Sequence, residues 1–454
     1  MTELLSIILA AGEGTRMRSA KPKVLHEVGG LPMVGHVVRT AQASGAASIA
    51  VVVGPNHEKV EIAVSDAVPN VTIARQTERL GTGHAVRQAE VAYSAAAGNV
   101  IVLYADNPLI SKDTVAEIQT RLDAGADIVV VGFRPADPTG YGRLLTEHGR
   151  LLAIREHKDA TDDERKVDLC NSGIMGFRAA TLRAVIDRIG NANAKGEYYL
   201  TDAVELAHGD GKRIEYVVAD ADEVIGVDDR TKLAKAEATF QELRREDFMR
   251  QGVTLHDPKS VYFSWDTKIG RDVVIEPNVF FGPGVVIEDE VVIHAFSHIE
   301  GAHVGRGATV GPFARLRPET NLGEGAKVGN FVEIKKAEIG KGAKINHLTY
   351  IGDAEIGAGT NVGAGTVTCN YDGINKFKTV IGADAFVGSN SSLVAPVSIG
   401  DGAYIGSGSV ITKDVEADAL ALGRAQQVTK PGYASKLRER AQALKALKQS
   451  KKQG

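Results

Sequence analysis

Residues 269–299 read IGRDVVIEPNVFFGPGVVIEDEVVIHAFSHI, with an aliphatic or aromatic residue at every sixth position. The spacing continues to Ile411, with a few steps of five and one gap of 13 residues after Thr368. Of the 24 positions in this frame, 23 are apolar, and Thr368 is the exception. A period of six is typical of a parallel β-helix, in which each short strand points one framed side chain inward and three strands complete a coil. The pattern predicts about eight coils stacked on this aliphatic core.

Glycine is concentrated in the same segment, because 24 of the 50 glycines lie within residues 265–411. Glycine eases the tight turns that such coils need. The 13-residue gap holds the sequence CNYDGINKFK at 369–378, which predicts a loop that leaves the regular coils. Loops on rigid scaffolds often carry function.

The first 230 residues have a different pattern, in which apolar β-branched runs alternate with helical patterns such as the one at 33–41. Strand and helix in alternation predict a mostly parallel α/β sheet whose ligands lie at the carboxyl ends of the strands. The segment 231–251 predicts a helical connector with Leu233, Phe240 and Leu243 on one stripe. The expected domains are 1–229, a linker at 230–251, and the β-helix with its tail at 252–454. Expected strands include residues 6–9, 49–53, 100–104 and 128–133.

Composition favours a globular protein: 454 residues are 43% hydrophobic and 24% charged, with a net charge of -4. No basic field indicates a nucleic-acid or membrane partner. Two cysteines cannot form a disulfide framework or a four-thiolate zinc site, which favours a reducing, cytoplasmic location. No apolar run approaches the roughly 20 residues that span a bilayer, and Glu3 stands where a signal peptide has basic residues.

The last 25 residues, 430–454, carry eight Lys or Arg and one Glu. Their spacing predicts a helix around Leu437, Ala441, Leu444 and Leu447. Two interpretations stay open: a solvated end of the chain, or a lid over an anionic ligand.

The strand at 6–9 runs into AAGEGTRM at 10–17, and Pro22-Lys23 follows. Glycines there allow backbone N–H groups to approach phosphates, and Arg16 and Lys23 add positive charge. The loop is neither a dinucleotide fingerprint, because Met17 replaces the third glycine, nor a Walker A loop, because no GK[ST] occurs. A purely structural turn is the alternative.

A second loop joins Gln76 to LGTGH at 80–84. The Gln76 amide can recognise the edge of a base, although Thr82 as a helix N-cap is an equally good interpretation of this segment. Asp106 follows the strand at 100–104 and, with Asp228, suits Mg2+, which takes one or two carboxylates together with substrate phosphates. For each aspartate a turn or cap is the alternative.

Glu156 and Asn171 are candidates for binding sugar hydroxyls, with ordinary surface groups as the alternative. In the β-helix, His347 lies two positions after the inward Ile345 and should face outward, where a neutral imidazole can take a proton from an amine. We expect Glu333 to orient it. Arg315, Arg317 and Lys335 are expected to hold a phosphate, and a solvated surface histidine is the alternative.

Both halves together resemble the bacterial bifunctional N-acetylglucosamine-1-phosphate uridylyltransferase/glucosamine-1-phosphate acetyltransferase family. The resemblance covers nearly the whole chain, and the most specific stretch is 368–378. The other matching stretches are Leu9–Met17, Pro22-Lys23, Gln76–His84, Glu156–Thr161, Asn171, Arg315–Pro318, Gly329–Glu333 and His347–Tyr350.

The resemblance implies a Rossmann-like nucleotidyltransferase domain followed by a left-handed parallel β-helix, assembled as a homotrimer with acetyl-transfer sites between subunits. It implies that His347 deprotonates the glucosamine-1-phosphate amine for attack on acetyl-CoA, with the Ala364 N–H as oxyanion donor. It places the sugar phosphate at Arg317, Lys335, Tyr350, Asn361 and Lys376. It places acetyl-CoA at Ala364, Asn370, Tyr371, Ser389, Ser407 and Arg424.

For the first domain, the resemblance implies attack of N-acetylglucosamine-1-phosphate on UTP with release of pyrophosphate. Arg16 and Lys23 would stabilise the developing charge, and Mg2+ would bind Asp106 and Asp228. The implied contacts to UTP and UDP-N-acetylglucosamine are Leu9, Ala10, Ala11, Gly12, Lys23, Gln76, Gly81, Thr82, Tyr104, Ala105, Asp106, Gly142, Glu156, Asn171 and Asp228.

Two alternatives compete with a bifunctional enzyme. One is a monofunctional sugar-1-phosphate nucleotidyltransferase with a structural or regulatory β-helix, against which the 370–378 loop and the His347 cluster argue. The other is a non-catalytic assembly protein, which would be expected to lack Arg16, Lys23 or Asp106.

Overall fold

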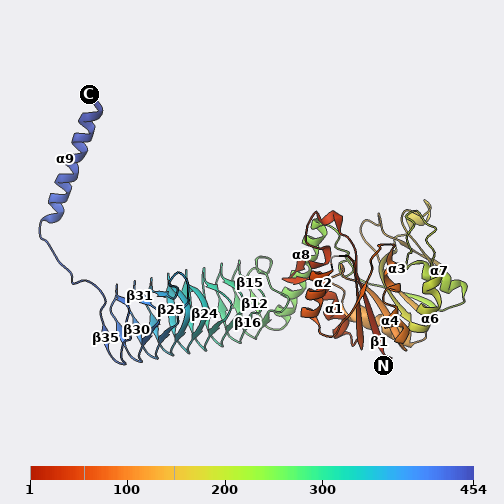
Figure 1. Ribbon diagram of the computed structural model, residues 1–454, viewed down its shortest axis with the longest axis horizontal. Coiled ribbons are helices and arrows are strands. Elements are labelled where there is room, and N and C mark those ends of the chain that lie inside the picture. The colour runs from red at the N-terminus through yellow and green to blue at the C-terminus, as the bar shows by residue number, and fades with distance from the viewer. Residues whose placement is uncertain (1, 56, 148, 454) are drawn as a thin grey trace. The chain divides into compact units, whose positions relative to one another are not determined.

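The computed structural model describes residues 2–55, 57–147 and 149–453 (Figure 1). The chain divides into two compact units, Met1–Val286 and Ile287–Gly454. The first unit holds the α/β part, a long helix and the first hexad strands. The second holds the remaining hexad coils and a terminal helix. No helix among the described residues is long and apolar enough to cross a membrane.

A nine-stranded sheet forms the centre of the α/β part, as far as the chain is described. Its strands run in the order β11-β7-β10-β6-β1-β4-β5, with β8 paired to β10 and β9 paired to β8. The pairs of β1 with β4 and β6 are parallel, but β10 is antiparallel to both β6 and β7, so the sheet is mixed. The strands are β1 (Leu4–Ala10), β4 (Ser48–Val53), β5 (Thr72–Arg75), β6 (Asn99–Tyr104), β7 (Ile128–Phe133), β8 (Arg143–Glu147), β9 (Arg150–Arg155), β10 (Cys170–Arg178) and β11 (Ile214–Val218).

Helices cover both faces of this sheet, which is why its strands are apolar throughout. In β1, Ile8 joins the apolar cluster on one face, and Ile7 joins the cluster on the other. The first cluster receives side chains from α1 (Met33–Ala43), α2 (Glu58–Ala67) and α5 (Lys112–Asp123). The second receives them from α3 (Thr82–Arg87), α4 (Glu90–Ala95), α6 (Ala179–Val185) and α7 (Asp202–Gly209).

Helix α8 (Arg230–Arg250) confirms the predicted connector, and Asp229 caps it by accepting a bond from the Lys232 N–H at 2.9 Å. Phe240 is buried as predicted, but Leu243 is 56% exposed, so the predicted stripe was wrong there. The buried face of α8 continues through polar side chains instead. Gln241 bonds both backbone groups of Phe263 and is therefore satisfied without water.

The hexad prediction is confirmed by burial. Ile269, in β13 (Lys268–Ile269), is partly buried, and each of the other 23 frame positions is at most 5% exposed. Thr368 fits this interior because its hydroxyl accepts a bond from the Gly352 N–H at 2.8 Å. The remaining hexad strands of the first unit, with one strand at the division between the units, are β12 (Thr254–Leu255), β14 (Val274–Ile275), β15 (Phe280–Phe281) and β16 (Val286–Ile287).

In the second unit the strands stack in parallel on three faces (Figure 1). Face A contains β17 (Val292–Ile293), β20 (Thr309–Val310), β23 (Lys327–Asn330), β25 (Lys344–His347), β27 (Asn361–Val362), β30 (Phe386–Val387), β33 (Tyr404–Ile405) and β35 (Leu420–Ala421). Face B contains β18 (His298–Ile299), β21 (Arg315–Leu316), β28 (Val367–Cys369), β31 (Ser392–Val394) and β34 (Val410–Ile411). Face C contains β19 (Ala302–Val304), β22 (Thr320–Leu322), β29 (Thr379–Ile381) and β32 (Val397–Ile399). Two longer strands join faces B and C: β24 (Glu333–Ile339) and β26 (Tyr350–Ile356).

The predicted loop leaves the coils between β28 and β29. It folds on itself through the Phe377 N–H, which donates to the Asn370 carbonyl at 2.8 Å, and a bridge between Tyr371 and Lys376. The predicted terminal helix is α9 (Tyr433–Gln453), and its described side chains, up to residue 449, are exposed. Within this chain the tail therefore has a solvated surface.

Candidate functional sites

The glycine-rich loop after β1 wraps around Lys23. Gly14 has φ 68°, and a Cβ added there would lie 2.4 Å from the Cβ of Lys23, so only glycine fits. A Cβ at Gly12 would lie 3.8 Å from Lys23 Nζ. Two short 3-10 helices, Thr15–Met17 and Lys23–Leu25, follow the loop. The backbone at Gly12 therefore lies beside a lysine ammonium, as a phosphate site requires, while Ala10 and Ala11 are buried where β1 ends.

Two cations and two carboxylates pair at the carboxyl end of β6. Lys23 Nζ pairs with Asp106, and Arg16 Nη1 lies 2.9 Å from Asp228 Oδ2. Lys232 Nζ also contacts Asp228, at 3.0 Å. The Val227 N–H donates to the Asp106 carbonyl at 2.8 Å, which joins the chain segments that carry the two aspartates.

This carboxylate pair fits a divalent cation. Asp228 Oδ1 is buried and has no hydrogen-bond partner among the described residues, an unsatisfied acceptor that a bound cation would satisfy. Mg2+ needs only one or two protein carboxylates when substrate phosphates supply other oxygens. Clusters of three or more metal-binding side chains are absent from the described ranges.

Gln76 and Gly81 lie together at the start of α3. The buried Gln76 amide donates to the Gly81 carbonyl at 3.1 Å and contacts His84 Nδ1 at 3.0 Å. Thr82 is the first residue of α3 and Gly81 occupies the N-cap position, so the interpretation of Thr82 as an N-cap was wrong. The Thr82 hydroxyl accepts a bond from the Leu200 N–H at 3.0 Å instead. Its role therefore depends on a chain segment 118 residues away.

The three residues predicted for the amino sugar meet at one point. A Cβ added to Gly142 would lie 3.4 Å from Glu156 Oε1 and 3.5 Å from Asn171 Cβ. Asn171 is buried, which argues against an ordinary surface group there, whereas Glu156 is partly buried. Burial raises the pKa of Glu156, with Lys195 acting in the opposite direction.

Tyr104 and Ala105 precede Asp106 and differ in exposure. Burial raises the pKa of the Tyr104 hydroxyl, and the charge of the nearby Glu156 adds to that effect. Ala105 is fully buried in the apolar cluster beneath the sheet, so only its backbone can face a nucleotide. Leu9 is also buried, and its carbonyl accepts a bond from the Ala105 N–H at 3.0 Å.

Sequence reasoning missed two residues of this crevice. Arg79 Nε donates to the Ala11 carbonyl at 2.9 Å and fixes the glycine-rich loop. The buried Thr201 side chain lies beside Glu156 and acts to lower the pKa of that carboxyl, against the larger effect of burial. Neither residue belongs to a recognisable local motif, so only the fold reveals them.

In the β-helix, His347 is exposed at the end of β25, as predicted. The prediction that Glu333 orients His347 was wrong. Glu333 instead pairs with Arg317 Nη1 at 2.8 Å and lies 3.9 Å from Arg315 Nη1. Asn330 Oδ1 contacts His347 Nδ1 at 2.6 Å. The strand register pairs Asn330 with His347 and Glu333 with Tyr350, which explains the exchange of partners. An Nδ1–H donated to Asn330 leaves Nε2 as the free base.

Three of the predicted acetyl-CoA residues lie one above another along one corner of the β-helix, starting next to His347. The Gly365 N–H donates to the His347 carbonyl at 3.3 Å, which places Ala364 beside the histidine. The Ala364 carbonyl accepts from the Asn390 N–H at 2.7 Å, and the Ser389 carbonyl accepts from the Gly408 N–H at 2.7 Å. Ala364, Ser389 and Ser407 therefore lie on successive coils.

Three cations gather near the predicted phosphate position. Lys376 and then Arg317 hold the pKa of the Lys335 ammonium below its usual range. Lys335 pairs with Gly352 on the next coil, and a Cβ added to Gly352 would meet the side chains of Tyr350 and Asn370. Asn361 lies on face A, whereas Tyr350 begins the strand that joins faces B and C. Tyr371 and Arg424 are exposed.

These features define a class: a nucleotidyltransferase joined to a hexapeptide-repeat transferase. Residues 6–167 match the MobA-like NTP transferase domain family. Residues 266–301 and 378–413 match the bacterial transferase hexapeptide family. The chain is 58% identical to the bifunctional protein GlmU of Azorhizobium caulinodans over 96% of this chain and 97% of the relative. It is 57% identical to the Agrobacterium fabrum GlmU, over 98% of both chains, and 55% identical to the Sinorhizobium fredii GlmU, over 99% of this chain and 98% of the relative.

The chain belongs to the GlmU family of bifunctional proteins. Membership confirms the predicted fold class, a Rossmann-like nucleotidyltransferase domain followed by a left-handed β-helix. It also confirms the predicted function: acetyl transfer to glucosamine-1-phosphate, followed by uridylyl transfer to N-acetylglucosamine-1-phosphate. The monofunctional and non-catalytic alternatives are thereby ruled out.

Proposed function

We propose that His347 is the general base of acetyl transfer. Its Nε2 takes a proton from the glucosamine-1-phosphate amine as the amine nitrogen attacks the thioester carbonyl. The Ala364 N–H stabilises the oxyanion, and the thiolate of CoA leaves as the tetrahedral intermediate collapses. The contact of Asn330 with Nδ1 supports this role, because it fixes the tautomer that frees Nε2.

The converging ammonium and guanidinium groups suit the phosphate of the amino sugar. Lys335 and Lys376 repel each other, and a phosphate dianion between them would relieve that repulsion. Arg317, Tyr350 and Asn361 complete the proposed phosphate and sugar contacts. Acetyl-CoA would lie along the corner formed by Ala364, Ser389 and Ser407, with Asn370, Tyr371 and Arg424 contributing from the loop and tail.

The acetyl-transfer site would lie between subunits of a homotrimer. Phe296, Phe313 and Phe331 stack along one edge of the coils, with centroids 4.9 and 5.1 Å apart, and Leu348 lies in the next coil. These side chains are 46–62% exposed and have positive φ, which is a costly conformation for bulky residues. An exposed apolar stripe that ends beside His347 fits a surface covered by another copy. The face A position of Asn361 agrees with a site shared between copies.

In the uridylyl-transfer crevice, the cations act on phosphates. Lys23 and Arg16 would leave Asp106 and Asp228 and bind the polyphosphate of UTP, stabilising the charge that develops as pyrophosphate departs. Asp106 and Asp228 would hold Mg2+, which when bound neutralises phosphate charge. Gln76, Gly81 and Thr82 would contact uracil, and Gly142, Glu156 and Asn171 would position the amino sugar.

By activity, the chain would divide into uridylyltransferase residues 1–229, a helical linker at 230–251 and an acetyltransferase at 252–454. The proposed substrates, namely the two amino-sugar phosphates, UTP and acetyl-CoA, are all small phosphorylated metabolites. The two free cysteines favour a location in the reducing cytoplasm.

A double assay tests this two-site assignment. The full chain is incubated with glucosamine-1-phosphate or its N-acetylated form, acetyl-CoA, UTP and Mg2+, and CoA thiol and pyrophosphate are followed separately. We expect His347→Ala to abolish thiol release and spare pyrophosphate release, and Asp106→Ala to do the reverse. Loss of both activities from either folded variant would disprove the assignment.

A further inference from the structure

Arg143 has an unusual place in the first unit. It is 1% exposed, and its charge acts on Asp137, but no ion pair joins its guanidinium to a carboxylate of the described residues. Its partners are backbone carbonyls: Nη1 donates to Tyr141, and Nε and Nη2 donate to Arg165 at 3.4 and 3.3 Å. Burying an uncompensated charge is expensive, so a neutral residue would be expected if packing alone mattered.

The carbonyl that Arg143 holds belongs to a segment between two proposed sugar contacts. Glu156 follows β9, Asn171 lies in β10, and the chain between them contains one short 3-10 helix, Glu164–Lys166. The turn that leads into that helix is closed by two reciprocal bonds: the Thr161 N–H donates to the Glu164 carboxylate at 2.7 Å, and the Thr161 hydroxyl accepts from the Glu164 N–H at 3.3 Å. The segment is therefore ordered by contacts of its own.

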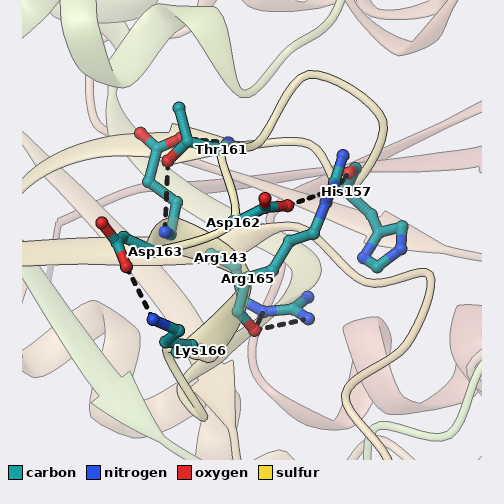
Figure 2. Close-up of polar contacts among 8 residues, drawn as sticks. Arg143, His157, Thr161, Asp162, Asp163, Arg165 and Lys166 are labelled. Carbon is teal, nitrogen blue, oxygen red and sulfur yellow. Dashed lines mark hydrogen bonds and ion pairs between the residues drawn. The ribbon is translucent and has the colours of Figure 1, made fainter.

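Arg165 connects this short helix back to the start of the segment. Figure 2 shows the Arg165 side chain reaching His157 and Asp162, while its carbonyl accepts from Arg143. Arg165 Nε donates to the His157 carbonyl at 3.3 Å, one residue after Glu156. Two arginines in series thus connect the start of β8, next to Gly142, to the residue beside Glu156.

The other end of the segment is also fixed at Gly142. The Gly142 carbonyl accepts from the Asn171 N–H at 2.9 Å, and Arg143 pairs with Cys170 across the sheet. Residues 142 and 143 therefore determine the positions of both ends: Asn171 through the backbone, and Glu156 through the guanidinium and Arg165.

We infer that Arg143 is a positioning residue for uridylyl transfer, which sets the affinity for the amino-sugar phosphate by holding Glu156 opposite Asn171. This inference rests on the proposed sugar contacts of Gly142, Glu156 and Asn171. Arg143 itself is buried and acts through the segment it holds.

The test is Arg143→Lys in the full chain. A lysine keeps the charge but cannot donate to two carbonyls from a planar fork. Losing about one such bond corresponds to roughly a tenfold change. We expect the KM for N-acetylglucosamine-1-phosphate to rise about tenfold, with kcat, the KM for UTP and thiol release each within about twofold. Arg165→Met, on the exposed side of the same connection, should raise the same KM about threefold.

Arg245→Lys is the matched control. Arg245 is also buried and donates to backbone carbonyls, those of Val261 and Lys259, which are not among the proposed sugar contacts. All constants should stay within about twofold in this variant.

An unchanged KM for N-acetylglucosamine-1-phosphate in folded Arg143→Lys would overturn the inference. Equal rises in the KM values for this sugar phosphate and for UTP, together with a fall in kcat, would also overturn it, because they would indicate general damage. If Arg143→Lys does not fold, Arg165→Met is the decisive variant. An unchanged KM for the amino-sugar phosphate in Arg165→Met then overturns the inference. Glu156→Gln distinguishes failure of the proposed sugar site from failure of the positioning role of Arg143. If Glu156→Gln leaves the sugar KM unchanged, the proposed sugar site fails; if it raises that KM and Arg143→Lys does not, only the role of Arg143 fails. Non-additive effects in the double variant would show that Arg143 acts through Glu156.

Discussion

Replacing Asn330 should change the pH dependence of acetyl transfer without changing uridylyl transfer. The Asn330 oxygen lies 2.6 Å from His347 Nδ1, and no other side-chain contact of that imidazole appears among the described residues. In Asn330→Asp the carboxylate keeps the hydrogen bond and adds a negative charge, which favours the protonated imidazole. Because the base must be neutral, the acid limb of the rate profile should move to higher pH. In Asn330→Ala the tautomer and ring orientation are no longer fixed.

The expected size of the pH shift follows from the exposure of His347. Two unit charges about 4 Å apart in a water-like medium interact by about 1 kcal/mol, because His347 is exposed. The acid limb in Asn330→Asp should therefore shift by about 0.8 pH unit. A net hydrogen bond contributes about 0.5–1.5 kcal/mol, so Asn330→Ala should lower kcat/KM about 2- to 13-fold.

The assay is CoA thiol release from pH 5.5 to 9, with pyrophosphate release from the same protein as the internal reference. The chain offers a matched control, since Asn321 Oδ1 contacts His303 Nδ1 at 3.0 Å elsewhere on the β-helix. Asn321→Asp should leave the profile unchanged. The reasoning is refuted if the Asn330→Asp limb stays where it is or moves to lower pH, or if Asn321→Asp produces the same shift.

Three further outcomes are expected. A chelator should stop pyrophosphate release and leave thiol release intact, with activity restored by Mg2+; loss of thiol release would contradict a metal confined to Asp106 and Asp228. Phe313→Glu should convert the proposed trimer to monomers, measured by light scattering, and reduce thiol release at least tenfold while sparing pyrophosphate release, because burying a carboxylate in an apolar stripe is costly; a variant trimer would refute the interface. Burial raises the pKa of Asp202 to about 6 from 3.8, so the folded chain holds the extra proton and stability falls as pH rises through that window. Asp202→Asn should therefore raise the free energy of unfolding by about 1–2 kcal/mol at pH 7.5 and by less at pH 4.5, followed as the thermal loss of pyrophosphate release; equal effects at both pH values would contradict the assignment.

The β-helix could be predicted from sequence because one inward side chain per strand decides it. Ile345 or Val387 has the same environment as its counterpart one coil away, so a regular spacing carries the fold. The polar partner of His347 could also have been found by counting. Asn330 lies 17 residues before His347, which is two steps of six and one of five in the frame, whereas Glu333 lies 17 before Tyr350.

The crevice of the first unit could be predicted only in part. Asp106 comes just after β6, and Arg16 and Lys23 lie in the segment that follows β1, so local sequence places them at one edge of the sheet. Thr201, Arg79 and the Arg143–Arg165 connection depend on which distant segments meet, and side-chain bonds to backbone carbonyls leave no mark in local sequence. For the same reason the Thr82 interpretation was wrong, because its partner, the Leu200 N–H, lies on another segment.

The two sites treat charge in opposite ways. In the crevice each cation already has a carboxylate, Lys23 with Asp106 and Arg16 with Asp228, so a polyphosphate must exchange partners and a divalent cation can take the released carboxylates. On the β-helix, Lys335 and Lys376 face each other, and their repulsion lowers the pKa of Lys335. A phosphate there gains attraction and removes repulsion without displacing a carboxylate from either lysine. If the proposed sites are right, a single phosphate would meet uncompensated cations at the second site, whereas a triphosphate at the first would have to displace carboxylates that a divalent cation would then bind.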